Sequence, residues 1–217
     1  MNKSTQSSIS QIPHSAWQQL LRLLKTRTAP TEPRTIKVGG PIQEIAAQLQ
    51  KRQSPRFFGL IPEQTALLAH FFPQEASAVL SQADAIREKR FSLSGLEYAA
   101  GKEIAWQRDF QHDYDWPSLH ISRLSHVDAD KVADPRPVWE LSSFYHGVRL
   151  GQAYLHTENE MYAASAIEQM EHWIGENPFE FGINWLSPTV VAIRTVNWLW
   201  TYYCILESKA LQTDFLA

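Results

Sequence analysis

Asn177 to Leu206 reads NPFEFGINWLSPTVVAIRTVNWLWTYYCIL and contains the most apolar run of the chain. Pro178 predicts the end of one helix, because a residue that precedes proline is disfavoured in the α conformation. Ser187 and Pro188 predict the start of the next helix, with serine as N-cap and proline at the first helical position. The loop between these boundaries carries Asn184 and Trp185. Loops held between rigid helices often display functional side chains, so we look for function there first.

The apolar run from Val190 to Leu206 raises the question of a membrane span. Its 17 residues lie at the short limit of about 17–25 residues for a span. Arg194 and Asn197 lie in its middle, where a membrane would tolerate them poorly. We therefore predict a buried core helix with neighbours on every side. The single cysteine, Cys204, excludes an internal disulfide and is expected to be an inert core thiol.

The composition is that of an ordinary soluble globular protein, with 44% hydrophobic and 20% charged residues among 217. A net charge of -3 and the absence of a basic run argue against a nucleic-acid surface. Residues 1–10 are polar and no apolar signal segment follows, so the default location is cytoplasmic. Seven of the eight tryptophans lie between Trp106 and Trp200. They can build a core or stack on sugars, and composition does not separate these alternatives.

The first 40 residues predict a flexible segment with one helix, from His14 to Arg27, and a linker rich in proline and glycine. Residues 41–217 predict a helical domain. Its first helices are expected at 42–52, at 63–71 and from Pro73, where apolar residues follow a 3.6-residue period.

The segment around 91–136 lacks sustained periodicity and begins with a short strand or turn at Phe91 to Gly95. A helix is expected from Pro137 to about His156. The next helix is expected to begin at a capping box formed by Thr157 and Glu160, and to end before Pro178.

A series of short motifs between about Asp84 and Leu206 resembles the N-terminal helical region of heparinase II/III-like polysaccharide lyases. Each motif is weak alone, but they follow the family's order over about 120 residues. They are 91–95; Ile104-Ala-Trp106 with Asp109-Phe110; Trp116-Pro117 with His120; Asp134 to Ser142; Gly151 to Tyr154 with Thr157; Asn177-Pro178; Gly182-Ile-Asn184-Trp185; and Ala192-Ile-Arg194 with Asn197-Trp198.

The resemblance implies an all-α fold, a partial (α/α) toroid of antiparallel helix pairs whose concave side holds an acidic polysaccharide. In that family a β-rich domain follows the toroid. The final apolar helix ends eleven residues before Ala217, so we expect this chain to be the front part of a larger, incomplete toroid. Family members are often periplasmic, whereas this N-terminus shows no export signal.

Such lyases cleave beside a uronate by β-elimination, which requires neutralisation of the carboxylate, a base and an acid. The resemblance assigns carboxylate neutralisation to Asn184, as the catalytic residue of this region. It places the acid and base, a tyrosine and a histidine, beyond Ala217. It implies no cofactor.

Five further residues are candidates for substrate binding: His120, Trp139, Glu140, Trp185 and Arg194. A buried, unpaired arginine would be costly, so we expect Arg194 to pair with Glu140. Asp109, His112, Asp113 and Asp115 lack the spacing of a calcium loop or a zinc site, and we predict a solvated acidic loop and no metal.

Two positions depart from the family pattern. Ser143 stands where the family typically has arginine, and Val190 where it typically has glutamate. Both changes remove a charge from the polar interior of the ring. Two functions therefore remain open: the leading part of a lyase, or a non-catalytic helical module that binds glycan or protein.

Overall fold

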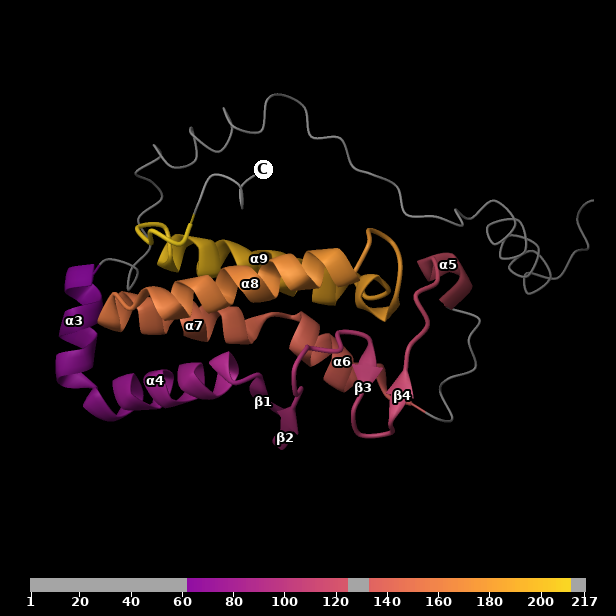
Figure 1. The fold of residues 1–217 in the computed structure, drawn as a ribbon, viewed down its shortest axis with the longest axis horizontal. Helices are drawn as coiled ribbons and strands as arrows, with labels where there is room; N and C mark the ends of the chain where they lie inside the picture. Colours follow the sequence, from indigo (N-terminus) through magenta and orange to yellow (C-terminus); the bar gives the residue numbers. More distant parts are fainter. Residues whose placement is uncertain (1–61, 125–132, 212–217) are drawn as a thin grey trace, which may run out of the picture.

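The computed structural model describes residues 62–124 and 133–211, which are mostly helical (Figure 1). The longer helices are α3 (Pro62–Phe71), α4 (Pro73–Arg87), α6 (Pro135–Ser142), α7 (Tyr145–Thr157), α8 (Glu160–Glu176) and α9 (Pro188–Cys204). Short turns form α5 (Ile121–Leu124) and the 3-10 helix η1 (Ile183–Trp185). The expected helices at 14–27 and 42–52 and the linker before residue 41 lie outside the described residues. The expected helices at 63–71 and from Pro73 are confirmed.

Two small antiparallel strand pairs occupy part of the segment expected to be irregular. Strands β1 (Arg90–Leu93) and β2 (Leu96–Ala99) form a hairpin, and β3 (Arg108–Asp109) pairs with β4 (Tyr114–Asp115). The expected strand or turn after residue 90 is therefore confirmed. The described chain is helical with two short ribbons, which refines the all-α prediction.

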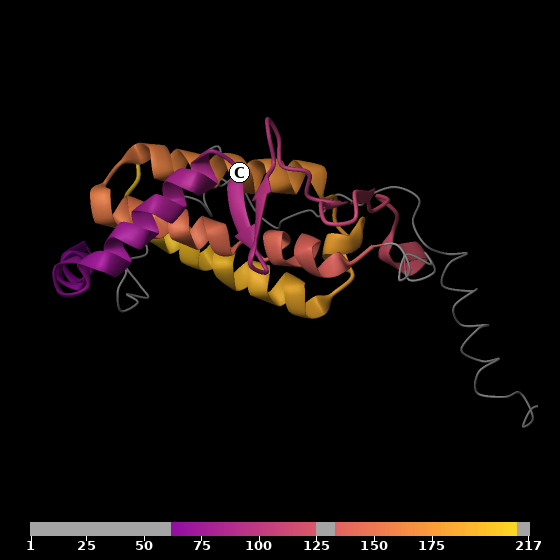
Figure 2. The ribbon, with the colours of Figure 1, turned by 90° about the horizontal axis from the view of Figure 1, so that it is seen from below.

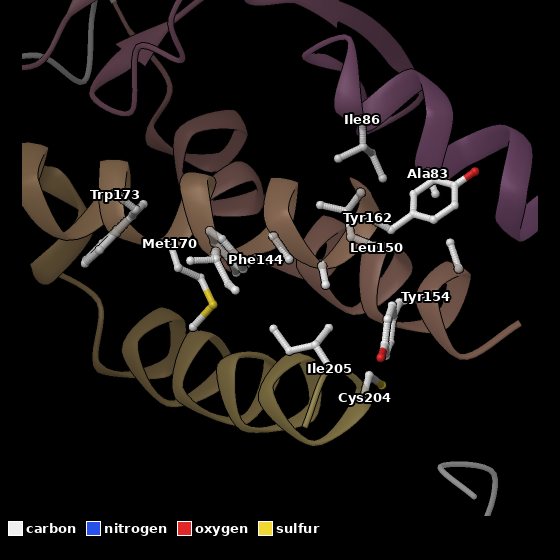
Figure 3. Packing of buried hydrophobic residues seen from close by; sticks show 14 of the residues in the cluster. Ala83, Ile86, Phe144, Leu150, Tyr154, Tyr162, Met170, Trp173, Cys204 and Ile205 are labelled. Atoms are coloured by element: carbon white, nitrogen blue, oxygen red, sulfur yellow. The ribbon is translucent and has the colours of Figure 1, made fainter. Parts of the chain in front are cut away.

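Helix α7 is the centre of the packing, with α4, α8 and α9 against it (Figures 1 and 2). Figure 3 shows Ile86 of α4, Leu150 of α7 and Met170 of α8 in the same interior. The close approach of α9 depends on glycine: a Cβ at Gly151 would lie 2.6 Å from the Cβ of Cys204. Cys204 is 1% exposed and burial raises its pKa to about 12, which confirms the expected core thiol.

The expected continuous helix over 137–156 is wrong, because the chain breaks it between α6 and α7. Phe144 takes a left-handed conformation, with φ of 64°, and its side chain is fully buried. A left-handed non-glycine residue costs roughly 1–2 kcal/mol. The phenyl ring packs against Trp106, His146 and Trp198, and burial of this ring offsets that cost.

The predicted capping box before α8 is also wrong. The N-cap is Asn159, whose side chain accepts from the backbone N–H of Met161. The Thr157 hydroxyl instead donates to the carbonyl of Ala153, and Glu160 accepts hydrogen bonds from Ser208 and the two residues after it. The cap of α9 is as predicted, since Ser187 accepts from Val190 N–H and Pro188 is its first residue.

The described residues leave one side of helix α9 uncovered, so the prediction of a helix buried all round is wrong for this part of the chain. Its buried positions are Val190, Arg194, Asn197, Thr201 and Cys204, whereas Val196 and Leu199 are about half exposed. The buried stripe is thus largely polar, and its polar groups bond to backbone carbonyls of the same core. No helix within 62–124 and 133–211 is long and apolar enough to cross a membrane.

Candidate functional site

The loop between α8 and α9 is held from inside by Asn177, the C-cap of α8. This residue is 2% exposed, and its Nδ2 donates to the carbonyl of Trp173 at 2.8 Å. Its Oδ1 accepts from Gln107 Nε2 and from Asn184 Nδ2, each at 2.8 Å. The helix end predicted at Asn177 is therefore confirmed, and its side chain also organises the loop that follows.

Asn184, the predicted catalytic residue, points into the protein. Its side chain is fully buried, and Nδ2 donates to the carbonyl of Trp106 at 2.7 Å and to Asn177 Oδ1. Both amide hydrogens therefore have acceptors within the protein. The buried Oδ1 has no hydrogen-bond partner among the described residues. Its role toward a substrate carboxylate stays a prediction.

Trp185 forms an aromatic surface with Phe179 at the same loop. The indole N–H of Trp185 donates to the carbonyl of Asn177 at 3.1 Å, which fixes the ring plane. Its ring meets Trp173 on one side, with centroids 5.7 Å apart, and the edge of Phe179, with centroids 5.1 Å apart. Trp185 is half-buried and Phe179 is 38% exposed. Part of this aromatic pair is therefore open to solvent.

Arg194 lies beneath this surface. Its guanidinium carbon is 4.0 Å from the ring centroid of Trp173 and 5.0 Å from that of Trp185, an arrangement that stabilises a cation through the aromatic faces. Nη1 donates to the carbonyl of Asn184 at 3.3 Å, while Nη2 has no partner in the described part of the chain. Desolvation lowers the Arg194 pKa to about 10, so the side chain is still cationic at neutral pH.

The predicted Arg194–Glu140 pair is wrong. Glu140 instead accepts hydrogen bonds from the backbone N–H and the hydroxyl of Ser94, at the turn of the first hairpin. This contact joins α6 to β1 and β2 across 46 positions of sequence. The Glu140 carboxylate is therefore engaged by the hairpin turn, although Glu140 directly follows Trp139 in α6.

Trp139 and His120 flank the loop from two other directions. The indole N–H of Trp139 donates to the carbonyl of Ile183 at 2.9 Å. His120 forms an isolated antiparallel bridge with Phe181, and its Nε2 lies 3.5 Å from a carboxylate oxygen of Glu180. Four of the six predicted residues, Asn184, Trp185, Arg194 and Trp139, thus meet at η1, with His120 at its edge.

Gln107 is a site residue that the sequence did not indicate. Its Oε1 accepts from the backbone N–H of Ile183 at 3.1 Å, while its Nε2 bonds Asn177. Gly182 allows this contact, since a Cβ there would lie 2.2 Å from Gln107 Nε2. These contacts join positions 70 to 76 residues apart, and no local pattern in the sequence marks them.

The two departures from the family pattern lie in packed positions. Ser143 is 4% exposed; its hydroxyl donates to the carbonyl of Trp139, and its own carbonyl accepts from Asn197 Nδ2 at 2.6 Å. Val190 is 8% exposed at the start of α9.

The prediction of a solvated acidic loop is wrong for Asp109, whose buried carboxylate organises the loop. Asp109 is fully buried and accepts from His112 Nδ1, at 2.7 Å, and from three backbone N–H groups. Desolvation acts to raise its pKa, but the hydrogen bonds from Asp134, His112 and Gln111 together hold it below its ordinary value. Asp113 and Asp115 are exposed and pair with Arg108. Within the described ranges, no group of three or more metal-ligating side chains is found.

Comparison with known proteins places these observations in one family. The sequence model described as "Heparinase II/III N-terminus" matches residues 6–217, which is nearly the whole chain. Searches of curated proteins and of solved structures gave no match. The motifs quoted from the sequence and the helical fold agree with this match. The chain therefore belongs to the heparinase II/III N-terminal family.

Proposed function

We propose that this chain is the helical part of a polysaccharide lyase that binds uronate-containing glycans and takes part in their β-elimination. The family match over residues 6–217 carries the proposal, since that family indicates a region related to polysaccharide lyases. The aromatic pair Phe179–Trp185 and the cation of Arg194 beneath it support it. A partly exposed indole can stack on a sugar, and a nearby cation favours an acidic sugar.

In this proposal the helices from α6 to α9 form the start of a curved array of antiparallel pairs, the incomplete (α/α) toroid. The glycan lies along the face that carries Trp185 and His120. Trp139 fixes η1 through its bond to Ile183, and so sets the position of Trp185.

Asn184 is the candidate for neutralising the uronate carboxylate. A neutral amide can donate to that carboxylate without adding a charge of its own, which makes the sugar C5 proton more acidic. One amide N–H now bonds Asn177 Oδ1. To act, Asn184 must exchange this acceptor for the carboxylate, with Arg194 still bonded to its backbone carbonyl.

A second function, a non-catalytic module that binds glycan or a protein, is supported by a specific observation. Both amide hydrogens of Asn184 already have internal acceptors, so its donors are satisfied without substrate. The absence of charge at Ser143 and Val190 points the same way.

The test is binding of heparan sulfate and of alginate, measured by titration calorimetry. We expect Trp185→Ala to weaken binding by about tenfold or more, because one stacked aromatic contributes on the order of 1–2 kcal/mol. Tyr145→Ala is the matched control, since Tyr145 is also exposed, at 55%, but lies at the start of α7. Equal binding by the wild type and Trp185→Ala would refute the proposed glycan surface.

The same samples distinguish a lyase from a binding module. A lyase converts the glycan into an unsaturated uronate product that absorbs ultraviolet light, whereas a module binds without forming it. If product forms, Asn184→Asp should abolish it, because the carboxylate replaces the donor with an anion. Far-ultraviolet circular dichroism shows whether that variant is folded.

A further inference from the structure

A second hollow lies away from the loop that carries Trp185, between α8 and the two ends of the first hairpin. Its volume is about 310 Å³. Glu168, Gln169 and His172 line it from α8, while Lys89, Lys102 and Glu103 line it from the chain around the hairpin. Pockets that hold small ligands begin at roughly this size. None of these six residues belongs to the site described above.

Gln169 lines the hollow and carries an unmet acceptor. The residue is 2% exposed, and its Nε2 donates to Ser165 Oγ at 3.2 Å and to the carbonyl of Ile86 at 3.4 Å. Its Oε1 is buried and has no hydrogen-bond partner among the described residues. A buried acceptor without a donor is costly, so a rotation of the Gln169 amide that brings Oε1 to a ligand hydroxyl in the hollow would stabilise the complex.

His172 supplies a donor with a defined orientation. The indole N–H of Trp106 donates to His172 Nδ1 at 2.8 Å. Because Nδ1 accepts this bond, the proton of the neutral ring is on Nε2, which remains to donate to a ligand. The carbonyl of the same Trp106 accepts from Asn184. One tryptophan therefore links the hollow to the candidate site.

The two lysines differ in whether their ammonium groups are held by other residues. Lys89 Nζ donates to the carbonyl of Lys102 at 2.8 Å and lies 3.4 Å from Glu168, so it is fixed at the wall. The ammonium of Lys102 and the carboxylate of Glu103 have no partner in the described part of the chain. The hollow thus offers acceptors and donors side by side, with one free cation among the described residues that line it.

We propose that this hollow binds a single sugar unit that carries a carboxylate, as a second glycan subsite. The inference rests on the proposed function and extends it to a separate surface. The hydroxyls of the sugar donate to Gln169 Oε1 and Glu103 and accept from His172 Nε2–H. Its carboxylate pairs with Lys102. The mixture of donors and acceptors suits a polyhydroxylated ring and does not suit a simple anion.

The experiment uses D-glucuronate as the probe, with acetate and D-glucose as comparisons, in ligand-observed NMR titrations of the whole chain. We expect glucuronate to bind more tightly than either. Lys102→Ala should weaken it by about tenfold, as expected for a lost hydrogen bond to a charged group. Lys209→Ala removes a lysine outside the hollow and should change nothing. Lys102 and Lys209 are both exposed, so neither variant is expected to unfold the chain.

Three results would overturn the inference: glucuronate that binds no better than acetate, glucuronate binding unaffected by Lys102→Ala, or no binding of the sugar at all. Titration of Trp185→Ala with the polysaccharide and with glucuronate separates this inference from the proposed function. If the polysaccharide binds through Trp185 while the hollow stays empty, only the second subsite fails. If the polysaccharide fails as well, the proposed function fails with it.

Discussion

At the scale of single residues, His146 is an imidazole buried among aromatic rings. It is 8% exposed, its ring centroid lies 4.3 Å from that of Phe144 and 5.2 Å from that of Phe91, and its buried Nε2 has no partner among the described residues. Burial lowers its pKa from 6.5 to about 3. The folded protein therefore holds this ring neutral over a range in which the unfolded chain protonates it.

This predicts a loss of stability in acid. Below the unfolded pKa of 6.5 the unfolded state binds more protons, so the free energy of unfolding falls as the pH drops. Between about pH 7 and about pH 4.5 the loss from this one residue is on the order of 2–3 kcal/mol. His146→Phe removes the titrating group while keeping a ring. Over the same pH change, the free energy of unfolding of this variant should therefore fall by about 2–3 kcal/mol less than that of the wild type. Urea unfolding at both pH values measures the difference.

The comparison between wild type and variant isolates His146 from other acid-sensitive groups. Asp109 and Glu160 also have lowered pKa values and lose stabilisation in acid, but they are the same in both proteins. An equal loss of stability in the two proteins would show that His146 does not titrate as its burial implies.

At the scale of elements, the loop between α8 and α9 depends on one glycine. Gly182 has φ of 84° and ψ of 169°, a conformation almost confined to glycine. Its Cα also faces the amide of Gln107, which ties Ile183 to Asn177. A side chain at position 182 would therefore have two effects: it would strain the backbone, and it would displace Gln107.

We predict that Gly182→Ala lowers the free energy of unfolding by about 3 kcal/mol, the sum of backbone strain and lost hydrogen bonds. Gly175→Ala is the matched control. Gly175 lies in α8, and a Cβ there meets nothing within 4 Å. That change should raise stability by about 0.5 kcal/mol, since alanine favours the helix. Urea unfolding followed by circular dichroism compares them, and similar effects in the two variants would contradict the role given to Gly182.

At the scale of the whole molecule, the described apolar residues form two separate clusters. The larger cluster surrounds α7 and includes Leu150 (Figure 3). The smaller cluster consists of Trp116, Ala133, Val138 and Ile183, and it lies under η1. The candidate site therefore lies where the two clusters meet: Ile183 belongs to the smaller cluster and Trp139 packs against it, whereas Trp185 packs against the larger one.

This division predicts local opening of the site. Val138→Ala removes two methyl groups from the small cluster and should speed amide hydrogen exchange across 181–187 by about tenfold, with little change in α7. Leu150→Ala should speed exchange in both regions, because α7 contacts most other helices. Exchange measured by mass spectrometry gives both rates. Uniform acceleration by Val138→Ala would mean that the two clusters unfold as one.

The sequence by itself determined most helix boundaries and the family. The boundaries at Pro73, Asn177 and Pro188 were predicted because proline and capping residues act on their immediate neighbours. The order of short motifs indicated the family, and the match over 6–217 confirms it. The sequence also selected four residues that meet at η1, although it did not show how they contact one another.

Only the tertiary structure decided the contacts that give these residues their surroundings. It broke the expected helix at Phe144, joined Glu140 to Ser94 instead of Arg194, and turned the amide of Asn184 inward to Trp106. The last two contacts link positions 46 and 78 residues apart. Local periodicity and capping report on neighbours within about one or two helical turns. A buried polar side chain instead takes whichever partner the packing brings to it, and that partner is fixed only when the chain has folded.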